Sequence, residues 1–183
     1  LEQRRFDLWG TKQVSQRWRR FRYHDQGHST LVVNGAEQVI SSRAPISSFS
    51  DAPNDRHATI DMTATYANEL KSATRKFTFS PDQVTIEDTI AAGAKDASIR
   101  WGMVTPATVN SAGPGAARLE QNGKRLRLEV ASPAGVTIES WSAERPKGEF
   151  DNPNPGVRVV GFIVPAKAGA SVTLQVSLRP ESN

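Results

Sequence analysis

The sequence predicts an all-β fold, a two-sheet antiparallel β-sandwich of roughly ten strands, on the basis of three observations. Short segments in which apolar and polar residues alternate recur about every 8 to 14 residues. Clusters of Gly, Pro, Asn and Asp separate these segments, as expected for tight turns. Beyond residue 20, apolar residues are not sustained at the spacing that a long helix needs. We therefore expect a single sandwich domain over residues 1–183.

The alternating segments give the expected strands in chain order. They are residues 30–35, 59–66, 74–79, 84–90, 98–105, 117–121, 125–130, 136–143, 157–164 and 172–178. The turns "SPDQ" at 80–83 and "QNGK" at 121–124 predict two hairpins, the second because Asn-Gly tolerates positive φ at both central positions. Residues 144–156 contain three prolines, which cannot donate to a strand ladder, and are expected to form a surface loop.

Charge is concentrated at the start of the chain. Residues 1–24 carry seven basic and two acidic residues, a local charge of +5, whereas residues 25–183 carry 16 basic and 17 acidic residues and balance at −1. One end of the molecule is therefore expected to attract a polyanion. Cys is absent, which excludes disulfides and thiolate sites. No apolar run approaches the ~18 residues of a membrane span, so we expect no membrane partner. The opening "LEQRRFDLWG" suggests a piece of a longer chain.

Residues 1–24 form a basic, aromatic segment at the edge of the expected sandwich. Either an irregular segment or an additional strand would bury its apolar side chains, namely Phe6, Leu8, Trp18 and Phe21. The exposed arginines are either a solvated face or one wall of a groove for an acidic ligand. In an extended segment, Arg17 and Arg19 would lie on one face and Arg20 and Arg22 on the other. Nucleic acid is not expected, because the OB-type and RNA-recognition signatures are absent and the rest of the chain is slightly acidic.

The three histidines, His24, His28 and His57, do not form a recognisable metal motif. His24 and His28 would share a face in a helix or a strand, but in a strand they would be about 13 Å apart. For each, an imidazole hydrogen-bonded to a backbone carbonyl is the ordinary alternative to a ligand. The chain also lacks a nucleophile elbow, a phosphate-binding Gly loop and a paired-carboxylate motif. We therefore expect no complete catalytic set and no cofactor-binding site.

The string "SQRWRRFRYHDQGHSTLVVNGAEQ" at 15–38 resembles a segment of the heparinase II/III-like polysaccharide lyases. In that family an R-W-x-x-x-R run leads into an H-N-T-L strand and an N-G or D-G turn. Here the strand begins His28-Ser29-Thr30-Leu31, with Ser29 in place of Asn, and the turn is Asn34-Gly35. Residues 73–90 resemble the "R…F……V.I.D.I" hairpin of the family, and residues 118–130 with the following Trp-bearing strand resemble its final part. The chain is thus similar to the C-terminal β-sandwich of these enzymes.

The resemblance implies a larger parent enzyme that cleaves uronic-acid-containing glycans, such as glycosaminoglycans or alginate, by β-elimination. Most of the catalysis would be done by an N-terminal α/α toroid, and residues 1–24 would face that domain, so this chain alone is expected to be inactive. The resemblance makes His28 a candidate ligand of a divalent metal, zinc or calcium, whose other ligands would lie upstream. Substrate contacts would come from the residues around it: Arg20, Arg22, Tyr23 and His24. A bacterial periplasmic or secreted location follows from the extracellular substrates of the family.

Two other functions remain open. The chain could be a non-catalytic carbohydrate-binding sandwich that uses Trp9, Trp18 or Trp101 as stacking platforms. It could also be purely structural, with the basic edge serving as an interdomain surface.

Overall fold

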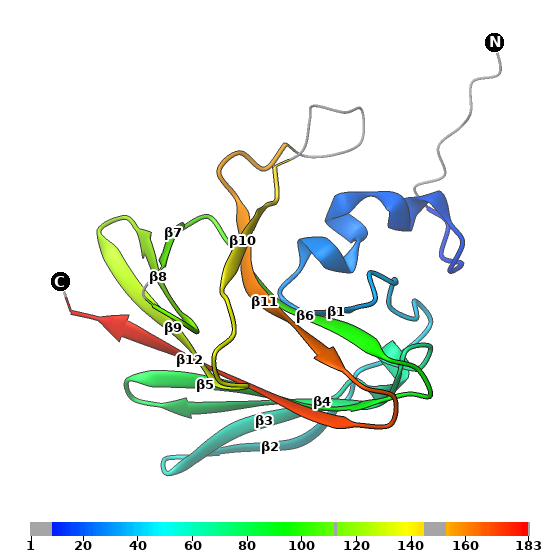
Figure 1. Ribbon diagram of the computed structural model, residues 1–183, viewed down its shortest axis with the longest axis horizontal. Coiled ribbons are helices and arrows are strands. Elements are labelled where there is room, and N and C mark those ends of the chain that lie inside the picture. The colour runs from blue at the N-terminus through cyan, green and yellow to red at the C-terminus, as the bar shows by residue number, and fades with distance from the viewer. Residues whose placement is uncertain (1–8, 112, 145–152, 183) are drawn as a thin grey trace.

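The computed structural model describes residues 9–111, 113–144 and 153–182, which form two antiparallel β-sheets packed face to face (Figure 1). The expected all-β sandwich is confirmed. The four-stranded sheet has the order β1-β6-β11-β10 and consists of Leu31–Val33, Ala97–Thr105, Arg158–Ala166 and Glu139–Ser142. The eight-stranded sheet has the order β2-β3-β4-β5-β12-β9-β8-β7. Its strands are Ile46–Ala52, Asp55–Asp61, Leu70–Ser80, Gln83–Ala92, Ser171–Glu181, Lys124–Ser132, Ala116–Gln121 and Thr108–Ser111.

The helical elements in these residues are short 3₁₀ turns. They are η1 (Gln16–Arg19), η2 (Phe21–Tyr23), η3 (Asp25–Gly27) and η4 (Thr63–Tyr66). The first three follow one another beside β1, at the end of the sandwich where the chain enters (Figure 1). None of the helices described is long and apolar enough to cross a membrane.

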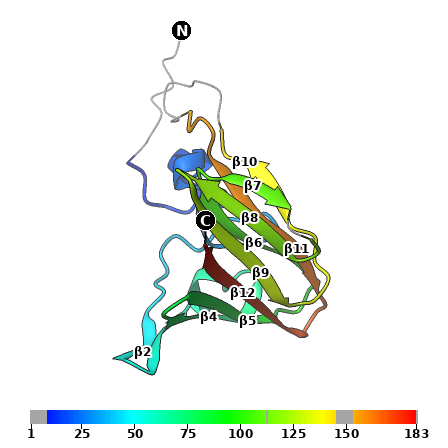
Figure 2. The same cartoon turned by 90° about the vertical axis from the view of Figure 1, so that its left-hand side faces the viewer.

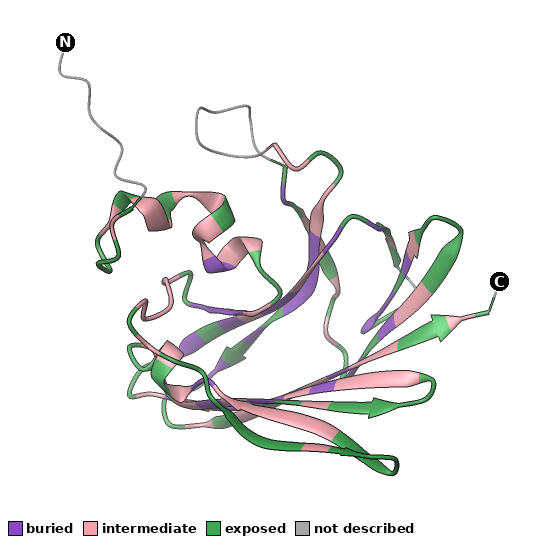
Figure 3. Ribbon diagram, turned by 180° about the vertical axis from the view of Figure 1, so that it is seen from behind, coloured by how far each residue is buried: buried purple, intermediate pink, exposed green. Residues whose placement is uncertain are grey.

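The core lies between the facing sides of the two sheets. Its largest buried side chains are Trp101 and Phe162, neighbours on β6 and β11, whose rings stack at 5.7 Å with an interplanar angle of 11°. Leu128 and Leu174, on the eight-stranded sheet, are fully buried in the same hydrophobic core. Figure 3 shows buried residues along the facing strands, while η1–η3 are mostly half-buried. Alternation along strands such as β5 and β12 therefore has the expected cause, since the face that each turns toward the other sheet is shielded from water.

Both expected hairpin turns are present. Asn122 and Gly123 have φ values of 52° and 71°, and they connect β8 to β9 with Gln121 opposite Lys124. Ser80 pairs with Gln83 across the β4–β5 turn. Most of the expected surface loop at 144–156 lies outside the described residues.

Two strands, β2 and β7, were not expected from the sequence. β2 is the edge strand "ISSFSDA", whose two large apolar residues, Ile46 and Phe49, are 64% and 68% exposed. A Ser-rich strand without a buried face lacks the alternation of apolar and polar residues by which a strand is recognised in a sequence. The strand expected over 59–66 was wrong in its second half. The Asp61 carboxylate accepts a hydrogen bond from the Thr63 amide at 2.9 Å, and the chain turns into η4.

Candidate functional site

From residue 9 on, the described part of the basic segment contains the 3₁₀ turns η1 and η2, followed directly by η3, and forms no strand. Extended backbone at Arg20, His24 and His28 ends each turn after three or four residues, which prevents a continuous helix. The Ser15 hydroxyl caps η1 by accepting from the Arg17 amide at 3.3 Å. Because residues 16–19 and 21–23 are 3₁₀ turns, the arrangement expected for an extended segment, with Arg17 and Arg19 on one face and Arg20 and Arg22 on the other, is wrong.

The turns gather cations around aromatic rings. The guanidinium carbon of Arg17 lies 4.6 Å from the centroid of the Tyr23 ring and that of Arg22 lies 4.9 Å from it. Arg17 is also 5.0 Å from the Trp18 ring, which meets Tyr23 edge-on. We call these four residues, Arg17, Trp18, Arg22 and Tyr23, the arginine–aromatic cluster. Stacking on a ring leaves the in-plane N–H donors of a guanidinium available to other acceptors.

A groove of about 560 Å³ lies between this cluster and the inner face of β3 and β4. Trp18 and Tyr23 form one wall, and Ile60, Met62 and Phe77 give an apolar floor. Polar side chains reach it from segments far apart in the sequence: Ser29, Thr30, Gln38, Ser42, Thr65 and Arg75. We refer to it as the β3–β4 groove. Aromatic walls with scattered hydroxyl and amide groups suit a sugar, which presents apolar ring faces and many hydroxyls.

His28 is exposed and ends η3, where its amide donates to the Asp25 carbonyl at 3.0 Å. Its Nε2 lies 3.1 Å from the carbonyl oxygen of Arg22. In the tautomer that makes this hydrogen bond, Nε2–H donates and Nδ1 keeps its lone pair, the arrangement common to metal-binding histidines. Within the described residues, however, no group of three or more His, Cys, Asp or Glu side chains could hold a metal ion. His28 by itself is one ligand and does not form a metal site.

His24 is held between two carboxylates. Its Nδ1 lies 2.7 Å from Oδ1 of the buried Asp25, and its Nε2 lies 4.0 Å from Oε1 of Glu37. The hydrogen bond with Asp25 raises the pKa of His24 above its usual value, with burial opposing the shift. Nδ1 also lies 3.2 Å from the Gln26 amide, so the neutral ring caps η3 and the protonated ring donates to Asp25. Both nitrogens thus face protein groups, which makes His24 a local structural residue as much as a substrate contact.

Arg20 and Arg22 differ in exposure. Arg20 is half-buried between η1 and η2, whereas Arg22 is exposed and belongs to the cluster. Trp18 and Phe21 are half-buried, and Phe6 and Leu8 lie outside the described residues. Trp101 is 1% exposed, so it cannot serve as a stacking platform, while Trp9 is 86% exposed.

The third histidine, His57, lies on the β2–β3 hairpin. Its Nε2 is 2.9 Å from the Ser48 hydroxyl and its Nδ1 is 2.9 Å from an Asp55 carboxylate oxygen. The three residues have the connectivity of a catalytic triad, but none of the pockets described in this part of the chain is lined by them. We infer that these hydrogen bonds have a structural role, in which His57 on β3 connects to Ser48 on β2.

Several groups that shape the site were missed from the sequence. The Tyr66 hydroxyl contacts the Thr30 hydroxyl, the Gln38 amide and the Leu31 carbonyl at 2.7–2.9 Å. Arg75 donates to the Ser29 carbonyl at 3.3 Å. These contacts fix the segment that runs from His28 into β1. The "R…F……V.I.D.I" pattern contained Arg75 but did not indicate what it binds.

Comparison with known proteins settles the family. The sequence profile described as heparinase II/III-like, C-terminal, matches residues 8–177. The chain belongs to this family. The family resemblance noted in the sequence is thereby confirmed, and the chain is a heparinase II/III-like C-terminal domain. Among curated proteins, no sequence relative matches.

Solved structures share the fold of this heparinase II/III-like domain. The heparan sulfate lyase HepC from Pedobacter heparinus matches with a TM-score of 0.69 and 13% identity, over 85% of this chain and 24% of that one. One heparinase III structure matches with a TM-score of 0.65 and 15% identity, over 85% of this chain and 24% of its own. A second heparinase III structure matches with a TM-score of 0.65 and 9% identity, over 83% of this chain and 23% of its own. The chain thus spans about a quarter of the length of these proteins.

Proposed function

We propose that this domain forms one side of the substrate cleft of a polysaccharide lyase that cleaves uronic-acid-containing glycans by β-elimination. The observation that carries the proposal is the arginine–aromatic cluster beside the β3–β4 groove, at the end of the sandwich where the chain enters. The N-terminal partner would be an α/α toroid of the same protein. The matched structures are those of a heparan sulfate lyase and of heparinase III, which supports an acidic glycan as substrate.

The chemistry assigns binding to this domain and leaves proton transfer to its partner. β-Elimination requires that the uronate carboxylate be neutralised, that the C5 proton be removed and that the leaving oxygen be protonated. Arg22 can pair with a carboxylate or sulfate through its guanidinium, and the Trp18 and Tyr23 rings can pack on sugar faces. The described residues do not bring together a base and an acid at the groove. The domain alone is therefore expected to bind without cleaving.

His28 lies at the end of η3, next in sequence to the groove residues Ser29 and Thr30. We propose that its Nδ1 faces the cleft and accepts a hydrogen bond from substrate or contacts the partner domain. A divalent metal there, zinc or calcium, would need ligands from outside the described residues. The test is a metal assay of the full-length parent and of its His28→Ala variant.

Glycan binding by the 183-residue chain tests the proposal. Titration calorimetry with heparan sulfate, alginate and hyaluronan oligosaccharides should show binding to at least one, weakened by salt because exposed charge pairs are screened. Arg22→Ala should weaken it about tenfold, as expected for loss of a charge-assisted hydrogen bond. Arg56→Ala is the matched control, since Arg56 is an exposed arginine on β3 that is not part of the arginine–aromatic cluster, whereas Arg22 stacks on the groove residue Tyr23. Equal effects of the two substitutions, or no binding of any uronate glycan, would refute the proposal.

The parent enzyme gives a second measurement. Arg22→Ala should raise KM for the polysaccharide more than it lowers kcat, because this side chain binds substrate and takes no part in proton transfer. The unsaturated uronate end of the product can be followed by ultraviolet absorbance. Because acidic polysaccharides lie outside cells, we also propose a periplasmic or secreted bacterial location, which cell fractionation tests.

A non-catalytic carbohydrate-binding module is the second candidate, favoured by the 86% exposed ring of Trp9. It predicts that the rest of the parent protein cleaves polysaccharide at an undiminished kcat when this domain is removed. The lyase-cleft proposal predicts that this activity is lost.

A further inference from the structure

A second cavity opens at the other end of the sandwich from η1–η3, and it has a different chemistry. It has a volume of about 690 Å³ and lies between β6 and the strands β8, β9 and β12. Figure 2 views the molecule from the side where β7, β8, β9 and the end of β12 lie. This volume falls within the range of small-molecule pockets, roughly 300–1,000 Å³. We call it the end cavity.

The strand register explains what lines it. Leu119 is opposite Leu126, and Leu126 is opposite Pro180, so the three side chains share the inner face of the eight-stranded sheet. Met103 and Ala107 close the other side. This is an aliphatic surface with no aromatic residue among its lining side chains. A sugar ring would find no stacking platform here, in contrast to the β3–β4 groove.

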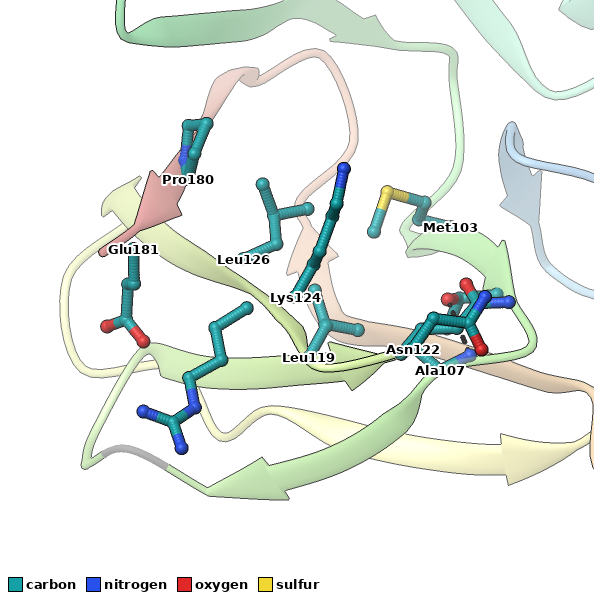
Figure 4. A pocket seen from close by; sticks show the side chains of 11 residues that line it. Met103, Ala107, Leu119, Asn122, Lys124, Leu126, Pro180 and Glu181 are labelled. Atoms are coloured by element: carbon teal, nitrogen blue, oxygen red, sulfur yellow. Dashed lines mark hydrogen bonds between the residues drawn. The ribbon is translucent and has the colours of Figure 1, made fainter. Parts of the chain in front are cut away.

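One cation faces this apolar surface. Lys124 is two residues before Leu126 on β9, so its side chain leaves the strand on the same inner face. Figure 4 shows it extending between Leu126 and Met103, with its ammonium group beside the cavity. Because Lys124 is exposed at the hairpin, its charge stays solvated when the cavity is empty.

The other charged groups at the rim are already paired. Glu181 accepts hydrogen bonds from Arg118 at 2.6 and 3.3 Å, and Arg125 lies 3.7 Å from Glu120. Among the described residues, no carboxylate forms an ion pair with Lys124. The cavity therefore combines an aliphatic interior with one uncompensated positive charge and the amide side chains of Gln121 and Asn122.

We propose that the end cavity binds an alkyl carboxylate: the hydrocarbon chain inserts between the sheets and the terminal carboxylate pairs with Lys124. Burial of each methylene contributes about 0.8 kcal/mol, which makes a chain of moderate length sufficient for measurable binding. The ammonium supplies the charge-assisted hydrogen bond that selects an anion over an alcohol. Such a site is independent of glycan binding at the opposite end.

Decanoate and decanol are the paired probes, used below their aggregation concentrations and followed by calorimetry and by amide chemical shifts in the 183-residue chain. Decanoate should bind saturably, about tenfold more tightly than decanol, with shifts centred on β9 and β12. Lys124→Gln should remove that preference and leave decanol binding unchanged. Lys95→Gln is the matched control, because Lys95 is an exposed lysine in the β5–β6 loop that does not line the cavity.

Met103→Trp should block both probes by filling the cavity, with thermal unfolding used to check that the variant is folded. Equal affinities for decanoate and decanol, or an unchanged preference in Lys124→Gln, would overturn the role of Lys124. Absence of saturable binding would overturn the site. Phosphatidylglycerol vesicles show whether the ligand is a free alkyl carboxylate or a membrane lipid. Binding to vesicles without binding to free decanoate would contradict the proposal and indicate a lipid surface instead. If uronate oligosaccharides changed the amide chemical shift of Lys124, the cavity would be a glycan site, and the proposal of an alkyl carboxylate would be overturned.

Discussion

Arg75 on β4 and Asp88 on β5 form a buried bidentate ion pair. They are opposite each other in the strand register, with Nε 2.7 Å from Oδ1 and Nη2 2.9 Å from Oδ2. Arg75 is 6% exposed and Asp88 is fully buried. The remaining guanidinium nitrogen, Nη1, donates to the Ser29 carbonyl, one residue after His28. The pair therefore connects the eight-stranded sheet to the segment that carries the candidate site.

Asp88→Asn should destabilise the protein by about 3–5 kcal/mol, because it leaves the buried Arg75 guanidinium without a counter-charge. Urea unfolding measures the free-energy difference. The double variant Arg75→Met/Asp88→Leu removes both charges and should lose much less. The double variant also lacks the hydrogen bond from Arg75 to the Ser29 carbonyl, which holds the segment after His28. Its glycan affinity should therefore fall even if its stability is close to that of the parent protein. An Asp88→Asn protein as stable as the parent would show that the pair contributes no such stabilisation.

The same residues show what the sequence could predict. In "VTIEDTI" at 84–90, alternation places Asp88 on the same face as Ile86 and Ile90, and all three are buried. The pattern thus fixed the strand and its inner face correctly. The partner of Asp88 depends on the register between β4 and β5, and periodicity along one strand does not specify a neighbour.

The candidate site was less predictable, for two physical reasons. The β3–β4 groove joins Trp18, Gln38 and Arg75, which come together only through long-range packing. The basic segment has no apolar period, so its 3₁₀ turns are determined by local caps such as Ser15 and by contacts with the sheet. The edge strand β2 was missed because it buries no regular face. Local patterns therefore gave the sandwich, and tertiary contacts determined the groove.

Tyr66→Phe should cost about 1–3 kcal/mol, because it removes the hydroxyl that donates to the Leu31 carbonyl and leaves the Gln38 amide with only its 3.3 Å hydrogen bond to the Thr30 hydroxyl. Burial raises the pKa of the Tyr66 hydroxyl, so the group remains a donor throughout the neutral range. Chemical unfolding measures the loss. Tyr23→Phe is the control, since no hydrogen bond of the Tyr23 hydroxyl is found within the described residues and its ring contacts would be kept. A similar loss in both variants would contradict the role assigned to the Tyr66 hydroxyl.

Gly161→Ala should destabilise the protein by more than about 3 kcal/mol or prevent folding, because a Cβ there would overlap the Trp101 carbonyl oxygen. Gly161 is opposite Gly102 in the β6–β11 ladder, and strand separation would disturb the neighbouring Trp101–Phe162 stack. Ile163→Ala on the same strand, where the side chain is 47% exposed, should cost about 1 kcal/mol or less. Thermal unfolding distinguishes them. A folded Gly161→Ala protein with an unchanged midpoint would contradict this account of the ladder.

His24 should make the stability depend on pH. Its hydrogen bond with Asp25 raises its pKa in the folded state above the ordinary value of 6.5, so the folded protein holds the proton more tightly than the unfolded chain does. The resulting stabilisation is fully present below pH 6.5 and decreases as pH rises through the folded pKa. Urea unfolding across this window should therefore show a larger loss of stability in the parent protein than in His24→Gln, which cannot titrate. Because both proteins share every other ionisable group, the difference between their slopes isolates the His24–Asp25 pair. Equal slopes would mean that the imidazole is equally protonated in the folded and unfolded states, and the pair would then contribute nothing to folding.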